Sequence, residues 1–155
     1  MHHSGRRGQG DEGAALVEFA LVAVLLATLI FGIINFGLLL SFKQDMTRAA
    51  AEGARQGAVA YPEADALTDA RAATATAVQG FDRTCGAGGL TCNVNMHDCD
   101  QPIPDPGWDT SPDPDCVTVE LVYDYDHYPL LAKLPMIEPF LPDWVRAKSV
   151  ARVNQ

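Results

Sequence analysis

The residue types best suited to chemistry gather in the second half of the chain. They are four cysteines and one histidine: Cys85, Cys92, His97, Cys99 and Cys116. Thiolates and imidazoles bind zinc, but structural zinc sites use cysteine pairs only about two to four residues apart, whereas six residues separate Cys85 from Cys92 and Cys92 from Cys99. An even number of cysteines at these spacings favours disulfides in an oxidising compartment. Three pairings are open, and we favour Cys85 with Cys92 and Cys99 with Cys116.

A second set of candidate ligands is acidic. Its members are Asp105, Asp109, Asp113 and Asp115. They could hold calcium, but their spacing does not match an EF-hand and prolines interrupt them, so a solvated loop is the simpler interpretation. The sequence has no nucleophile elbow, phosphate-binding loop or HExxH motif, and we expect His127 to be structural. We therefore predict no catalytic residue, no enzyme activity, no cofactor and no metal.

The longest feature of the sequence is apolar. Phe19 to Phe42 is a run of 24 residues without Asp, Glu, Lys or Arg, longer than the roughly 20 residues that a helix needs to cross a bilayer. A cleaved signal peptide would have an apolar region of about 7–15 residues, so a membrane anchor is favoured. Glu18 stands at the edge of this run. Because a carboxylate in hydrocarbon costs roughly 2.5–3.5 kcal/mol, Glu18 either has a partner or lies in the headgroup zone.

Charge and cysteine placement bear on location and partners. The net charge of −9 argues against binding to nucleic acid, which needs a basic surface. Arg6 and Arg7 favour a cytoplasmic amino terminus, although Lys43 and Arg48 follow the apolar run. All four cysteines lie after the run. We therefore expect a single-pass protein of the plasma (inner) membrane with an extracytoplasmic carboxy-terminal domain.

Composition divides the chain into four parts. They are a polar leader (1–13), an apolar transmembrane helix (14–42), a helix extension (43–60) and a head (61–155). Good helix formers and the lack of proline predict one helix, beginning near Ala14, that is about 70 Å long. A break near Lys43 is the alternative.

The head contains signals for one helix and several strands. After the turn at Pro62 a second helix is predicted to end near Gly80 and to pack on a sheet. Its apolar face consists of Leu67, Ala70, Thr74, Ala77, Val78 and Phe81. A short strand is expected within 92–97, and two longer strands within 116–127 and 145–154.

The two longer strands suggest a register. Val117, Val119, Leu121, Tyr123 and Tyr125 share the inner face of the first of them. Placing Val122 opposite Val150 in an antiparallel pair sets Glu120 against Arg152, Asp124 against Lys148 and Asp126 against Arg146. On the inner face the same register sets Val119 against Val153 and Leu121 against Ala151. Opposite charges across a pair each contribute roughly 0.2–1 kcal/mol, and the predicted fold class is α+β.

Four short stretches occur in a distinctive order. They are "GAALVEFAL" (13–21), "FGIINFG" (31–37), "AAAEGARQGA" (49–58) and "AKSVARVN" (147–154). Together they resemble a prepilin of the type IV pilus family, and most closely the TadE-like minor pilins (pseudopilins) of Tad, or Flp, pilus and secretion systems. The resemblance implies a pilin-like α+β fold with a long amino-terminal transmembrane helix, followed by a small head with a second helix and an antiparallel sheet.

The resemblance also implies site residues and partners. A prepilin peptidase would cut between Gly13 and Ala14, and Glu18, fifth in the mature chain, would dock on the amino terminus of a neighbouring subunit. The partners would be the lipid bilayer, the prepilin peptidase, other pilin subunits and the Tad assembly machinery. The implied function is structural and consists of initiation, capping or regulation of pilus assembly. The resemblance also allows incorporation of the protein in an extracellular fibre. The alternative is an unprocessed, membrane-anchored extracytoplasmic binding module.

Overall fold

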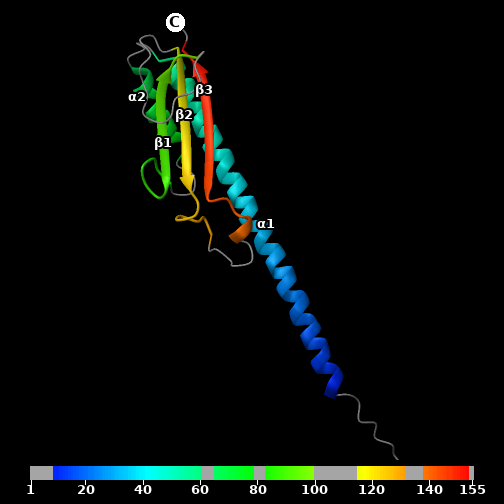
Figure 1. The fold of residues 1–155 in the computed structure, drawn as a ribbon. Helices are drawn as coiled ribbons and strands as arrows, with labels where there is room; N and C mark the ends of the chain where they lie inside the picture. The colour runs from blue at the N-terminus through cyan, green and yellow to red at the C-terminus, as the bar shows by residue number, and fades with distance from the viewer. Residues whose placement is uncertain (1–8, 61–64, 79–82, 100–114, 132–137, 154–155) are drawn as a thin grey trace, which may run out of the picture.

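The computed structural model describes residues 9–60, 65–78, 83–99, 115–131 and 138–153. One helix, α1 (Gln9–Ala58), extends from the head as a long shaft (Figure 1). Its 50 residues correspond to about 75 Å, and it passes Lys43 without the break considered as an alternative. It begins at Gln9 rather than near Ala14.

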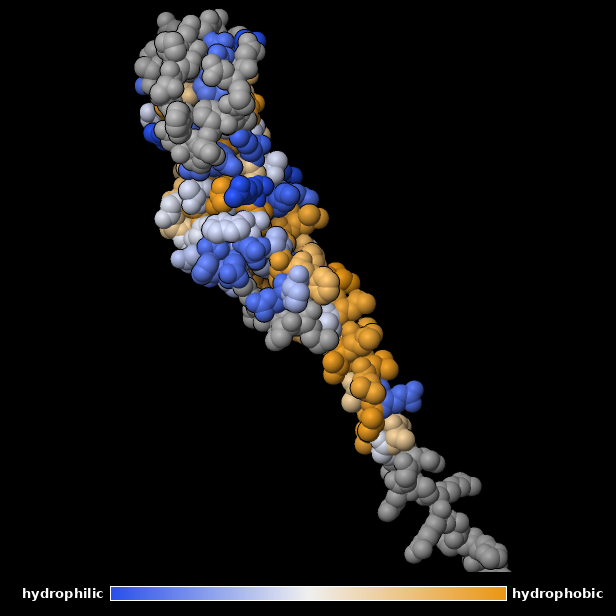
Figure 2. Space-filling model, in the orientation of Figure 1, coloured by the Kyte–Doolittle hydropathy of each residue, from blue (hydrophilic) through white to orange (hydrophobic). Residues whose placement is uncertain are grey.

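The two halves of α1 have different surroundings. From Gly13 to Ile34 no side chain is buried, and Figure 2 shows apolar surface along this protruding half below a more polar head. From Asn35 onward one face is covered by the head. The buried apolar residues of that face are Phe42, Met46, Ala49, Ala50, Ala54 and Ala58. The first half is therefore an all-round apolar rod, whereas the second half is part of a folded core.

The second helix, α2 (Ala66–Ala77), packs chiefly on α1 and only secondarily on the sheet, which corrects the expectation that it lies on the sheet. The reason is a pair of glycines one turn apart. A Cβ at Gly53 would lie 2.0 Å from Thr74 Oγ1, and a Cβ at Gly57 would lie 2.9 Å from Ala70 Cβ. Because neither glycine has a side chain, the two helix backbones approach closely, as in other small-residue helix pairs.

The apolar face predicted for α2 is mostly correct. Ala70, Thr74 and Val78 are buried and Leu67 is half-buried, but Ala77 is exposed. The helix ends at Ala77, earlier than the predicted stop near Gly80. The predicted start at Pro62 and the contact of Phe81 lie outside the described residues.

Within the described residues the sheet has three antiparallel strands in the order β1-β2-β3. They are β1 (Leu90–His97), β2 (Cys116–Asp124) and β3 (Trp144–Arg152), and a short 3-10 helix, η3 (Glu138–Phe140), precedes β3. The inner face predicted for the central strand is buried from Val117 to Tyr125, although Tyr125 falls just beyond β2. This face contacts α1, where the rings of Phe42 and Tyr123 meet edge to face with centroids 4.6 Å apart.

The predicted register between the last two strands is wrong by four residues. Val122 lies opposite Arg146 instead of Val150, and Glu120 lies opposite Lys148 instead of Arg152. The other predicted pairs move with them: Asp124–Lys148, Asp126–Arg146, Val119–Val153 and Leu121–Ala151 are not partners.

The backbone at the closed end of the hairpin explains this register. The N–H groups of Tyr125 and Asp126 both donate to the carbonyl of Asp143, at 3.0 and 3.1 Å, so the ladder starts at Asp124 opposite Trp144. Surface charge pairs are too weak to override such bonds. The shift is an even number of residues, so each side chain keeps its predicted face.

Both disulfides join the predicted cysteines. Cys85 is bonded to Cys92 in β1, and Cys99, just after β1, is bonded to Cys116 at the start of β2. One bridge therefore ties the approach to β1 and the other closes the connection between β1 and β2. Cross-links of this kind stabilise a small domain whose core is limited.

We expect Gly53→Ala to destabilise the head. The added methyl group would meet Thr74 Oγ1, which is held in place because it donates to the carbonyl of Ala70 at 2.7 Å. Overpacking costs about 1–3 kcal/mol, against a helix-propensity gain of about 1 kcal/mol. The thermal midpoint of the full-length protein in detergent, followed by circular dichroism, should therefore fall by several degrees.

Two variants make this measurement specific to the helix contact. Gly37→Ala lies on the same helix with no atom within 4 Å of its added Cβ and should not lower the midpoint. Thr74→Ala removes the clashing hydroxyl, so the double variant should lose less stability than the two single effects combined. Additive losses would contradict a direct contact between residues 53 and 74.

Candidate functional site

The residues predicted to be processed and to dock lie together near the free end of α1. Gly13, Ala14 and Glu18 are all helical and exposed. Ala14 and Glu18 are four residues apart and therefore share one face of the helix. A Cβ at Gly13 would have no described atom within 4 Å, so packing within this chain does not require glycine there. The structure thus places the three residues on one exposed stretch of helix that starts at the Gly13–Ala14 bond.

The rod beyond Glu18 is apolar on every side. Its large side chains are exposed from Leu16 to Ile34, and a shallow depression of about 680 Å³ lies among Leu21, Val24, Leu25, Thr28 and Leu29. Its polar side chains bond to their own helix, because the hydroxyl of Thr28 donates to Val24 O and the amide of Asn35 donates to Phe31 O, each at 2.9 Å. The helix is long and apolar enough to cross a membrane.

The "EGAR" stretch (residues 52–55) forms a hydrogen-bonded polar edge beside the contact of Gly53 and Gly57 with α2. Arg55 donates to both carboxylate oxygens of Glu52, at 3.0 and 2.7 Å, and the amide of Gln56 donates to Glu52 at 2.9 Å. These bonds, with Arg55 first and Gln56 second, lower the pKa of Glu52 to about 2. The carboxylate is thus held as an anion by its own helix.

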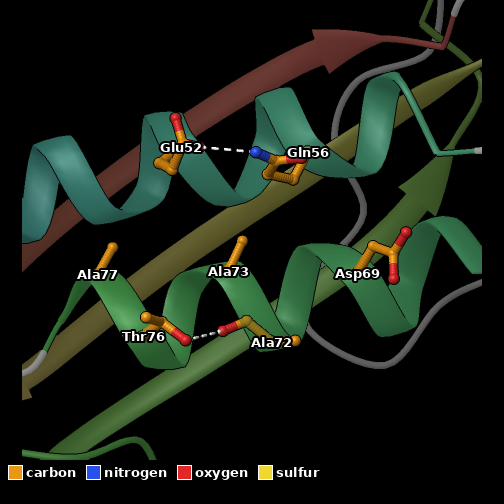
Figure 3. A pocket seen from close by; sticks show the side chains of 7 residues that line it. All are labelled: Glu52, Gln56, Asp69, Ala72, Ala73, Thr76 and Ala77. Atoms are coloured by element: carbon orange, nitrogen blue, oxygen red, sulfur yellow. Dashed lines mark hydrogen bonds between the residues drawn. The ribbon is translucent and has the colours of Figure 1, made fainter.

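A cleft of about 520 Å³ lies between α1 and α2 next to this edge (Figure 3). It is lined by Glu52, Gln56, Asp69, Ala72, Ala73, Thr76 and Ala77. The hydroxyl of Thr76 donates to the carbonyl of Ala72, and Glu52 is bonded as above. Among the described residues that line it there is no cysteine, serine, histidine or lysine, so these residues supply neither an activated nucleophile nor a histidine to act as a base.

The side chains considered for zinc are used structurally. All four cysteines are in disulfides. His97 is buried, with Nδ1 donating to the carbonyl of Asp98 at 2.8 Å and Nε2 2.7 Å from the hydroxyl of Thr118. Among the described residues no group of three metal-binding side chains occurs. Asp105, Asp109 and Asp113, considered for calcium, lie outside the described residues.

His127 has the structural role expected of it. Its backbone N–H and Nδ1 contact the carboxylate of Asp124 at 3.1 and 2.8 Å, which closes the turn after β2. Burial raises the pKa of Asp124, but the hydrogen bonds from His127 outweigh it and leave the pKa below its usual value. This carboxylate is a turn-stabilising anion.

A long apolar helix that carries a small head of one helix and an antiparallel sheet defines a pilin-like α+β protein. The family described as TadE-like protein matches residues 13–55. This segment contains the exposed rod, Glu18 and the "EGAR" stretch, so the resemblance found in the sequence is confirmed over these residues. The head beyond residue 55, including the terminal strand, lies outside the match. No curated protein and no solved structure matches the chain.

Two features of the site were not anticipated from the sequence. One is the contact of Gly53 and Gly57 with α2, although their four-residue spacing is a recognisable signal for close helix packing. The other is a groove of about 320 Å³ where α1 enters the head. It brings together residues of α1 and of β3 that are about a hundred positions apart, so local patterns could not reveal it.

We expect the hydrogen bonds of Glu52 to make the stability of the head decrease with falling pH over a defined range. Since its folded pKa is about 2 and its ordinary value 4.5, its stabilising contribution is complete above about pH 4.5 and disappears as the pH falls to about 2. The difference in thermal midpoint between the natural protein and Glu52→Gln should therefore narrow over this range. Asp69→Asn removes the other carboxylate of the cleft and is the control. A difference in thermal midpoint that does not vary with pH would contradict a stabilising role for the Glu52 carboxylate with a lowered pKa.

Proposed function

We propose that this protein is a structural, non-enzymatic minor pilin that takes part in assembling a Tad/Flp-type pilus. The observation that carries the proposal is a rod of exposed apolar side chains that continues, without a break, into the core of a folded head. The family match over residues 13–55 supports it, since it covers the rod and its junction with the head. Initiation, capping or regulation of assembly is the role that we assign.

The apolar surface of the rod suits both the membrane, before assembly, and the fibre, after it. In the inner membrane its side chains contact lipid, and its backbone donors and acceptors bond within the helix, as hydrocarbon requires. In a fibre the same side chains would pack against helices of neighbouring subunits. The head, with its two disulfides, belongs on the extracytoplasmic side in this arrangement.

Processing at Gly13 would complete the docking site. Cleavage by a prepilin peptidase would place an ammonium group on Ala14, one helical turn from the carboxylate of Glu18 on the same face. Both charges are costly in hydrocarbon, and pairing offsets part of each cost. The bond is helical here, so the peptidase must unwind the first turns. Gly10 and Gly13 make that easier because glycine disfavours a helix by about 1 kcal/mol each.

The alternative function is a membrane-anchored binding module whose leader is retained. A head with its own disulfide-linked core is compatible with it. The two functions differ in the mature amino terminus, because only a pilin requires a free amine at Ala14.

We expect mass spectrometry of the protein from its native membrane to give a chain that begins at Ala14. Glu18→Ala should leave insertion into membranes intact but reduce the amount of pilus-incorporated protein by at least about tenfold, equivalent to about 1.4 kcal/mol. Glu120→Ala, a change of the same kind on the sheet, is the matched control. Retention of residues 1–13 together with normal piliation in Glu18→Ala would favour the anchored binding module.

A further inference from the structure

The groove where α1 enters the head combines an apolar lining with two cations. Phe36, Leu39, Leu40 and Lys43 line it from α1, and Pro142, Trp144, Val145 and Arg146 line it from the start of β3 and the residue two positions before it. The side chains of Lys43 and Arg146 are exposed. Neither has an ion pair with a described acidic residue. The acidic Asp143 is close in sequence but does not line the groove.

The position of the groove along α1 coincides with the edge of a bilayer. Charged residues bound the apolar run at Glu18 and Lys43. A hydrocarbon core of about 30 Å takes about 20 helical residues, so a core that starts at Phe19 ends near Leu38. The apolar part of the groove therefore lies at the outer boundary of the hydrocarbon, with Lys43 about one turn beyond it, at the depth of lipid phosphates.

Exposed aromatic rings of the head gather at the same end. Phe140, Trp144 and Tyr128 are 73 %, 52 % and 46 % exposed, and they are the exposed aromatic residues of the described part of the head. Trp144 starts β3 and Tyr128 follows the end of β2, while η3 lies beside α1 at the lower end of the head (Figure 1). Tryptophan and tyrosine favour the membrane–water interface, so this end of the head has the composition of a membrane-facing surface.

We propose that the groove binds one anionic phospholipid. The glycerol and the part of the acyl chains nearest to it would lie against Phe36, Leu40 and Trp144. The phosphate would lie between Lys43 and Arg146. Lysine supplies a point charge to a phosphate, and arginine can bind two of its oxygens. The lipid would set the depth and tilt of the head on the membrane. The proposal rests on the proposed function only in requiring that α1 spans a bilayer.

Quenching of Trp144 fluorescence by brominated lipid tests the proposal. The chain has two tryptophans, so Trp108→Phe leaves Trp144 as the sole reporter in the full-length protein, reconstituted in vesicles. Brominated phosphatidylglycerol as a minor component of phosphatidylcholine should quench it more strongly than the same fraction of brominated phosphatidylcholine. From about 1 kcal/mol for each cation near an anionic lipid, the preference should be about tenfold or more.

Matched charge variants locate the preference. Lys43→Gln combined with Arg146→Gln should reduce the preference for phosphatidylglycerol over phosphatidylcholine to about one. As the control, Arg71→Gln combined with Lys148→Gln removes two exposed cations outside the groove and should preserve this preference. Native mass spectrometry of the unsubstituted chain, released from mixed bilayers, should show a retained phosphatidylglycerol that the first pair of substitutions removes.

The other outcomes are distinguishable. Equal quenching by both lipids, or equal loss of preference in both double variants, would overturn the lipid site and leave only non-selective contact with the membrane. Absence of quenching by either lipid would overturn it as well, and would indicate that another protein surface covers Trp144. Flotation of the protein with vesicles measures membrane insertion separately. A protein that floats without lipid preference refutes the groove alone, and one that fails to float refutes the membrane anchor itself.

Discussion

The continuity of α1 is the constraint on which the rest of the structure depends. A helix satisfies its own backbone hydrogen bonds, so it can leave lipid and enter a protein core without a change of conformation. What changes along α1 is the side chains: large and exposed on all sides up to Ile34, then buried on the face that meets the head, where they become small from Ala49 onward. Gly53 and Gly57 belong to that second part, and their contact with α2 fixes the head to the rod.

The junction between the two halves of α1 is also where polar groups lie beside apolar surface and must be satisfied. Asn35 is buried at the start of the covered face, and its amide bonds to the carbonyl one turn earlier. Lys43 then ends the run without charges. Between them, Phe42 makes the ring contact with Tyr123 that joins the helix to the central strand. The transition from exposed apolar rod to protein core is thus completed within about two turns.

The sequence predicted those features that depend on local patterns. Helix length and the inner face of β2 follow from absence of proline and apolar periodicity. Cysteine number and spacing predict disulfides, and the pairing favoured among the three open ones is the pairing in the structure. The predicted strand register is wrong because it rests on charge pairs, whereas backbone hydrogen bonds to Asp143 determine the register. The close approach of α2 to α1, and the groove formed with Trp144, depend on contacts between distant segments. The functional roles of Gly13, Ala14 and Glu18 remain predictions.

The order of the strands has a consequence for proteins crowded in two dimensions. Because β2 lies in the middle of the described strands, β3 is an edge strand among them, and edge strands are sites where a second copy can pair and aggregate. Arg146, Lys148 and Arg152 project from β3 as exposed cations. Two heads that met strand to strand while confined to one membrane surface would bring these like charges together, and the repulsion would oppose their clustering.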